Sequence, residues 1–149
     1  MTAVDGGLTG RTYPPGEPFV VGREQIRAFA VAVGADHPWH HDVAAARGAG
    51  YADVVAPPTF AVVLAQRSDA RLITDPAADI DYSRVVHGEQ RFTHHRPIVA
   101  GDELVASLHV DAVRSAGGHA MVTTRSEITT VGGHPVCTAV SLIVVRGES

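Results

Sequence analysis

A run of apolar residues directly after two prolines is the feature that most limits how this chain folds. Phe60 to Ala65 is apolar nearly all round a helix, which is typical of a helix surrounded by protein. Pro57 and Pro58 suit the start of such a helix, because the N–H that proline lacks has no helical partner there. The run turns polar from Gln66 to Arg71, so we expect only the first half of the helix to be central.

The second half of the chain has a period of two residues, which is typical of half-buried strands. Apolar or small residues alternate with polar ones from Tyr82 onward and again from Leu104 to Asp111. Gly117-Gly118 and Gly132-Gly133 are hairpin signals and predict strands over 119–131 and 136–145. Long meandering strands after one buried helix predict an α+β fold, with an antiparallel sheet wrapped round that helix.

The first part of the chain is predicted to be mostly helix and loop, within a single domain spanning residues 1–149. Residues 1–16 are rich in glycine and proline and are expected to be an irregular lead-in. A short strand is predicted at 19–21 and a short helix at 43–47. A longer helix is predicted from Arg23 to its stop at Gly34, on the spacing of Ile26, Phe29, Ala30 and Val33.

Composition excludes several classes of function. The net charge is −4 and the twelve basic residues, all arginine, are scattered, which argues against nucleic-acid binding. Schiff-base chemistry is excluded because there is no lysine. Cys137 is the only cysteine, so no internal disulfide is possible. It lies in an alternating apolar strand and is expected to be a buried core residue rather than a nucleophile. Apolar runs are shorter than a membrane span and residues 1–10 do not resemble a signal peptide, so we expect a cytoplasmic protein without membrane insertion.

One loop concentrates groups that exchange protons near neutral pH. Three histidines and two aspartates lie within the nine residues from Gly34 to Asp42, beside the only tryptophan. Pro38 forces His37 away from helical geometry, so His40 is expected on a stiffened turn. This loop is the candidate acid/base site.

Four motifs follow one another along the chain: Arg11–Pro15, Ala56–Phe60, Asp81–Gln90 and Arg96–Leu104. Their order and spacing resemble the hotdog fold of the MaoC-like dehydratases and (R)-specific enoyl hydratases, in particular the actinobacterial HadA-type subunits of (3R)-hydroxyacyl-ACP dehydratase. The resemblance covers nearly the whole chain as a single MaoC-like hotdog domain.

The active loop of that group has the pattern Asp-x-Asn-Pro-x-His. Pro38 meets the proline of this pattern and His40 meets the catalytic histidine. His37 replaces the asparagine. Ala35 stands where the catalytic aspartate is expected, and Asp36 lies one residue late.

The resemblance implies a role for each of these positions. Dehydration of a 3-hydroxyacyl thioester needs a group that takes a proton from C2 and a group that protonates the leaving hydroxyl. His40 is the expected acid/base. Asp36 either moves into the vacant carboxylate position or caps a turn, and His37 is expected to orient the loop. Backbone N–H groups of Thr59 or Phe60 are expected to bind the thioester oxygen.

Further binding residues are expected along the helix and sheet. The side chains of Phe60, Val63 and Leu64 are candidates for lining an acyl tunnel, and His87 is a second candidate for substrate binding. His94 and His95 are expected on opposite faces of a strand. No cofactor or metal is expected; a metal site in the His/Asp loop is disfavoured, because adjacent loop histidines usually point apart.

The function implied is dehydration of (3R)-3-hydroxyacyl thioesters of ACP or CoA, or the reverse hydration, in fatty acid or polyketide metabolism. Hotdog sheets of this family pair edge to edge, and a lone open edge would be a liability, so the resemblance implies a dimer, either a homodimer or a heterodimer with a second hotdog subunit. One alternative is a non-catalytic subunit that holds the acyl chain, and another is a tailoring enzyme of secondary metabolism on the same fold. Hotdog thioesterases typically carry a carboxylate on the central helix. Thioester hydrolysis is disfavoured because the first half of this helix carries none and Asp69 lies too far along the helix.

Overall fold

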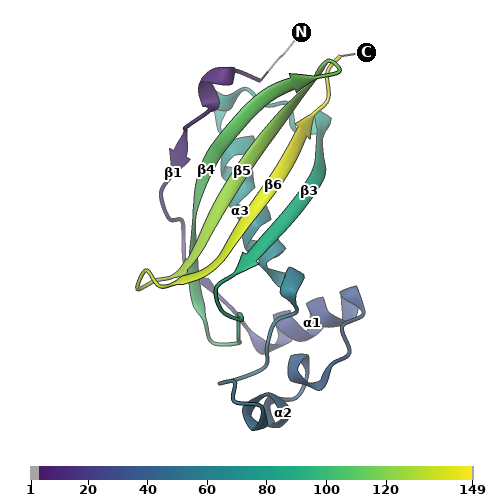
Figure 1. Ribbon diagram of the computed structural model, residues 1–149, viewed down its shortest axis with the longest axis vertical. Helices are drawn as coiled ribbons and strands as arrows, with labels where there is room; N and C mark the ends of the chain where they lie inside the picture. Colours follow the sequence, from purple (N-terminus) through teal and green to yellow (C-terminus); the bar gives the residue numbers. More distant parts are fainter. Residues whose placement is uncertain (1–3, 149) are drawn as a thin grey trace.

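A six-stranded antiparallel sheet curves round one central helix (Figure 1). The computed structural model describes residues 4–148. The strand order is β1-β4-β5-β6-β3, and β2 also pairs with β4. The strands are β1 (Thr12–Tyr13), β2 (Phe19–Val20), β3 (Val85–His94), β4 (Glu103–Ala116), β5 (His119–Thr130) and β6 (Pro135–Val145). The predicted antiparallel sheet round a helix, and with it the α+β class, is confirmed.

The central helix begins as a 3₁₀ turn, η3 (Pro58–Ala61), and continues as α3 (Val62–Ile73). Two further helices, α1 (Arg23–Val33) and α2 (Val43–Gly48), lie beyond the lower end of the sheet in Figure 1. The predicted stop of α1 is confirmed: Gly34 has φ 72° in the left-handed region, which glycine adopts without a Cβ clash. Short 3₁₀ turns complete the chain: η1 (Gly6–Leu8), η2 (Pro38–His40), η4 (Pro76–Ala78) and η5 (Tyr82–Arg84).

The lead-in is more ordered than predicted. Thr12 and Tyr13 pair with His109 and Leu108 of β4, and the Tyr13 hydroxyl donates to Asp75 at 2.6 Å. The expectation of an irregular segment is therefore wrong for these residues. A two-residue strand shows no periodicity, and its partner lies far along the chain. Residues 1–3 of the predicted lead-in lie outside the described residues.

The buried face of α3 runs to its last turn. Leu64, Ala65, Ser68, Asp69 and Leu72 share this face at helical spacing and are buried against the sheet. Leu72 is 0% exposed. The expectation that only the first half is central is therefore wrong, because the polar residues after Ala65 are divided between an exposed face and this buried one.

A layer of polar side chains divides the core in two. One apolar cluster surrounds the first half of α3 and includes Phe60 and Ile98. The other surrounds its second half and includes Leu72 and Val122. Between them lies a polar belt of five buried residues: Ser68, Asp69, Thr124, Ser126 and Ser141.

Candidate active site

The His/Asp loop is a 3₁₀ turn fixed by its own side chains. Pro38 occupies the first position of η2, and the Nδ1 atom of His37 accepts the Trp39 N–H at 3.3 Å. This contact ties the His37 ring to the backbone of its own loop. After this turn, Asp42 caps α2 by accepting the Ala44 N–H at 2.9 Å.

His40 is tied to the chain that leads into the central helix. Its Nδ1 atom lies 2.6 Å from the carbonyl oxygen of Val55, and the ring is half-buried. The N–H of Val55 in turn donates to the Trp39 oxygen at 2.8 Å. A carbonyl oxygen only accepts hydrogen bonds, so Nδ1 carries the proton. In the neutral ring, Nε2 is then the basic atom.

His40 lines a pocket of about 660 Å³. The rings of Trp39 and Tyr51, with centroids 5.2 Å apart, form one wall. The residues lining this His40 pocket come from the loop, the segment before η3 and the end of β3: His37, Trp39, His40, Tyr51, Val55, Ala56, Pro57, Pro58, His94, His95, Arg96, Pro97 and Ile98.

Two histidines at the end of β3 lie on the same pocket. The expectation that they point to opposite faces agrees with their partners on β6: His94 pairs with buried Cys137, whereas His95 Nε2 lies 3.1 Å from the hydroxyl of the next residue, Thr138. Both nevertheless line the His40 pocket, because the strand ends at His94 and the chain bends at His95. His94 is held by the Pro58 oxygen, 2.7 Å from its Nε2.

The carboxylate position remains open. Asp36 is exposed and is not among the residues lining the His40 pocket. Ala35 stands at the expected carboxylate position, and its carbonyl oxygen lies 2.9 Å from Nε2 of His41. His41 is therefore turned back onto the loop backbone. The loop places two imidazoles, those of His37 and His40, on the pocket and no carboxylate.

The start of η3 offers a backbone donor. The Phe60 N–H donates to the Pro57 oxygen at 2.9 Å and so is engaged within the turn. Among the loop and turn hydrogen bonds of residues 4–148, Thr59 N–H makes none. Of the two expected donors, Thr59 therefore keeps a free N–H beside the pocket-lining Pro58.

The side chains expected to line an acyl tunnel lie in the core, away from the His40 pocket. Phe60 is 1% exposed and packs edge-on against Phe29, with ring centroids 5.4 Å apart. Leu64 is buried in the same core, and Val63 packs against it half-buried. None of these side chains lines the His40 pocket. His87 lines a different pocket, beside the second half of α3.

Comparison with known proteins shows the family to which this chain belongs. The family model described as FAS1-like, dehydratase domain region, matches residues 7–139. The chain belongs to this family of dehydratase regions. A UPF0336 protein of Saccharopolyspora erythraea is 52% identical over 146 residues, which cover 98% of this chain and 94% of the relative.

Solved structures of dehydratases share the architecture. The HadBC (3R-hydroxyacyl-ACP dehydratase) complex of Mycobacterium tuberculosis has a chain that superposes with TM-score 0.82 at 35% identity, covering 92% of this chain and 96% of that one. A MaoC-like dehydratase gives TM-score 0.85 at 35% identity over 95% of this chain and 43% of that one. The predicted hotdog fold and membership of the MaoC-like group are confirmed.

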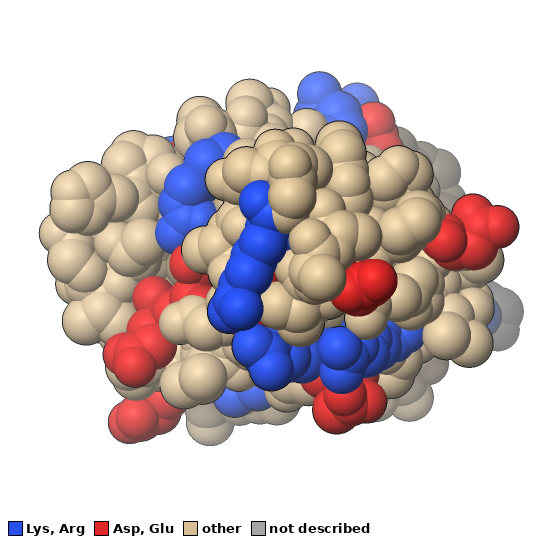
Figure 2. Space-filling model, turned by 90° about the horizontal axis from the view of Figure 1, so that it is seen from below, with Lys and Arg blue, Asp and Glu red and all other residues tan. Residues whose placement is uncertain are grey.

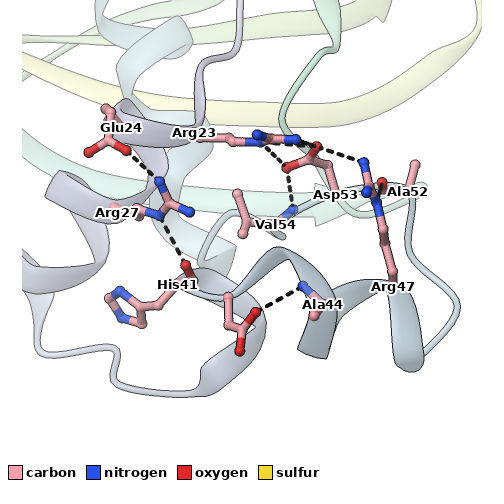
Figure 3. A network of polar contacts seen from close by, with 10 residues as sticks. Arg23, Glu24, Arg27, His41, Ala44, Arg47, Ala52, Asp53 and Val54 are labelled. Atoms are coloured by element: carbon pink, nitrogen blue, oxygen red, sulfur yellow. Dashed lines mark hydrogen bonds and ion pairs between the residues drawn. The ribbon is translucent and has the colours of Figure 1, made fainter.

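A polar network braces the loop of this FAS1-like dehydratase region (Figure 3). Arg23 of α1 binds both carboxylate oxygens of Asp53, at 3.0 and 2.8 Å. Arg47 of α2 lies 3.7 Å from the same carboxylate, which also accepts the Val54 N–H. These bonds outweigh partial burial and hold the pKa of Asp53 below its ordinary value, with the Arg23 hydrogen bond as the main cause. The network fixes the segment that carries Val55, the partner of His40.

Positively and negatively charged side chains are mixed at the lower end of the molecule. Figure 2 views this end and shows arginines interspersed with acidic residues on a mostly uncharged surface. Within residues 4–148, no group of three or more His, Cys, Asp or Glu side chains is arranged to hold a metal ion. Over the same residues, no helix has the length and apolar character needed to span a membrane.

Sequence reasoning missed several pocket residues of this family member. Trp39 and Tyr51 form an aromatic wall, and the only signal was the position of Trp39 between Pro38 and His40. Asp69 was set aside as too far along the helix, yet it is buried at 6% exposure. Asp69 lies four residues after Ala65 and three before Leu72, so helical spacing places it on the apolar face. This spacing was the sequence signal for its burial.

Proposed function

We propose that this chain is a (3R)-3-hydroxyacyl-thioester dehydratase, equally a trans-2-enoyl-thioester hydratase, with His40 as its acid/base. The observation that carries the proposal is the 2.6 Å contact of His40 Nδ1 with the Val55 oxygen, on the wall of a pocket of about 660 Å³. This contact orients the ring and leaves Nε2 for proton transfer. Membership of a dehydratase family supports the reaction type.

One imidazole suffices for both proton transfers. Nε2 of His40 takes the proton from C2 of the substrate, the C2=C3 double bond forms, and the C3–O bond breaks. The same Nε2–H then protonates the departing hydroxyl, so that water leaves and the ring returns to its neutral form. The two protons are handled on one face of the substrate, which predicts syn elimination. Hydration is the reverse sequence.

The thioester oxygen needs a donor where negative charge develops. The Thr59 N–H, at the first turn after Pro58, suits this role because the described backbone leaves it unpaired. The aromatic wall of Trp39 and Tyr51 supplies apolar surface for the acyl or pantetheine part of an ACP or CoA thioester.

A second candidate is a non-catalytic subunit that holds the acyl chain for a partner. The exposed position of Asp36 and the alanine at position 35 favour it, because no carboxylate joins His40 on the pocket. The similarity to a chain of the HadBC complex also favours a partner. In this account β3, which pairs with β6 on one side only, joins a second hotdog subunit edge to edge.

Hydration of crotonyl-CoA by the purified chain alone separates the two candidates. The loss of enoyl-thioester absorbance is followed with no other protein present, and the oligomeric state is measured in the same buffer. The dehydratase proposal predicts steady turnover by the chain itself, as a homodimer. Activity that appears only when a second hotdog protein is added, and that survives His40→Ala, would support the non-catalytic subunit instead.

A further inference from the structure

A second pocket lies between the last turns of α3 and the start of β3. Its volume is about 540 Å³, and it shares no lining residue with the His40 pocket. Polar and apolar side chains both line this Asp69 pocket: Gln66, Asp69, Ala70, Ile73, Thr74, Tyr82, Ser83, Val85, His87 and Ile143.

The inner wall of the pocket carries a buried carboxyl group. Asp69 is 6% exposed, and the Thr124 hydroxyl donates to its Oδ1 atom at 2.6 Å. Burial raises the pKa of Asp69, while hydrogen bonds from Thr124 and Ser141 and the charge of His87 oppose the rise. No arginine among residues 4–148 forms an ion pair with this carboxyl group. When the His87 ring is neutral, an ionised Asp69 therefore has no cationic partner among these residues.

His87 presents an acceptor to the same pocket. Its Nε2 lies 3.1 Å from Oε1 of Gln90, and that amide is oriented because its nitrogen donates to the Val140 oxygen at 3.1 Å. An amide oxygen only accepts, so Nε2 of His87 carries the proton and Nδ1 of the neutral ring is an acceptor. A β-bulge follows this residue, where the pairing of β3 with β6 shifts register between His87 and Glu89.

The polar belt that includes Asp69 is expected to stabilise the fold less than apolar side chains would in the same positions. The hydroxyls of Ser68 and Ser126 are buried without a hydrogen-bond partner among the described residues. Burying such groups, and a carboxyl group beside them, costs free energy relative to apolar side chains. A buried acidic group that opens onto a pocket is instead typical of a functional site.

We propose that the Asp69 pocket binds a small primary amine with an apolar body. The ammonium group donates to the Asp69 carboxylate and to Nδ1 of His87, and it brings the positive charge that the buried carboxylate lacks. The apolar body packs on Ile73, Val85 and Ile143 of the pocket wall. An anion is disfavoured by the carboxylate, and a neutral alcohol satisfies only the hydrogen bonds.

Three six-carbon probes test the proposal on the unmodified protein. Hexylamine, hexanol and hexanoate have the same apolar body and differ in head group. Each is titrated into the ¹⁵N-labelled chain while backbone amide shifts are followed. Hexylamine is expected to shift signals of Asp69, Ile73 and His87 and to bind at least tenfold tighter than hexanol, with hexanoate weakest. Equal affinity for hexylamine and hexanol, or shifts confined to the His40 pocket, overturns the proposal.

Asp69→Asn isolates the charge. The variant keeps the side-chain shape and an oxygen for the Thr124 hydroxyl, so it is expected to fold with an unfolding midpoint at or above that of the wild type. Its affinity for hexylamine is expected to fall at least tenfold, while hexanol binding changes little. Asp79→Asn is the matched control, because Asp79 is exposed and its left-handed φ of 51° suits asparagine. Undiminished hexylamine binding by Asp69→Asn contradicts the proposal.

Discussion

The Nδ1 atom of His40 lies 2.6 Å from the carbonyl oxygen of Val55, a residue fifteen positions further along the chain. The Val55 N–H donates back to Trp39, next to His40. This reciprocal pair holds the loop against the segment entering the central helix and leaves Nε2 as the basic atom of the ring.

The tautomer of His40 is the first expected consequence. In the neutral form, the proton is expected on Nδ1, because the Val55 oxygen only accepts. The ¹⁵N shifts of the two ring nitrogens, recorded above the titration of the ring, distinguish the tautomers. A neutral ring protonated at Nε2 would contradict this arrangement.

Weakening the contacts of Asp53 with Arg23 and Arg47 is expected to make the His/Asp loop less rigid. Asp53→Asn weakens the bonds from Arg23 and Arg47 and is expected to lower both the free energy of unfolding and the hydratase rate. Folding lowers the pKa of Asp53, chiefly through the Arg23 hydrogen bond. The stabilisation is therefore complete above the ordinary pKa of 3.8 and is lost as pH falls through the lower pKa of the folded state.

Urea unfolding of the wild type and Asp53→Asn over a pH series checks this sign. The difference in unfolding free energy between them is expected to be constant near neutral pH and to shrink well below pH 3.8. A difference that grows on acidification would show that the pKa of Asp53 is raised rather than lowered on folding.

Restoring a carboxylate at position 35 is expected to raise activity. Ala35→Asp supplies the group that the resemblance to MaoC-like dehydratases places beside the catalytic histidine, and a second proton-transfer group contributes about 10²-fold or more. The comparison is kcat/KM for crotonyl-CoA, with Asp36→Ala in the same background to remove the neighbouring carboxylate. A loss of activity in Ala35→Asp, with folding intact, would contradict the proposed geometry.

Cys137 is expected to be inert in the folded protein. It is 0% exposed, and burial raises the pKa of its thiol to about 11. The thiolate is the reactive form, so labelling by a thiol reagent at pH 8 is expected to be slow in native protein and complete in urea. Rapid native labelling would contradict the burial of β6 at this residue.

The fold was predictable where its signals are local. The stop of α1 follows from Gly34, the hairpins from Gly117-Gly118 and Gly132-Gly133, and the buried helix from Phe60 to Ala65. The pairing of Thr12 and Tyr13 with β4 was not predictable, because it depends on contacts about a hundred residues away.

The candidate site was predictable only in part. The motif located the loop and His40, but not the bend that brings His94 and His95 onto one pocket. The burial of Asp69 was missed although its spacing along the helix indicates it, and its hydrogen-bond partner Thr124 lies on a distant strand.

The rate of crotonyl-CoA hydration by His40→Ala tests the central claim most directly. The variant leaves a space where the imidazole stood and is compared with wild type and with His134→Ala, in the exposed β5–β6 hairpin. We predict that kcat/KM falls about 10²- to 10⁴-fold in His40→Ala and is unchanged in His134→Ala. Wild-type activity in folded His40→Ala would contradict the account.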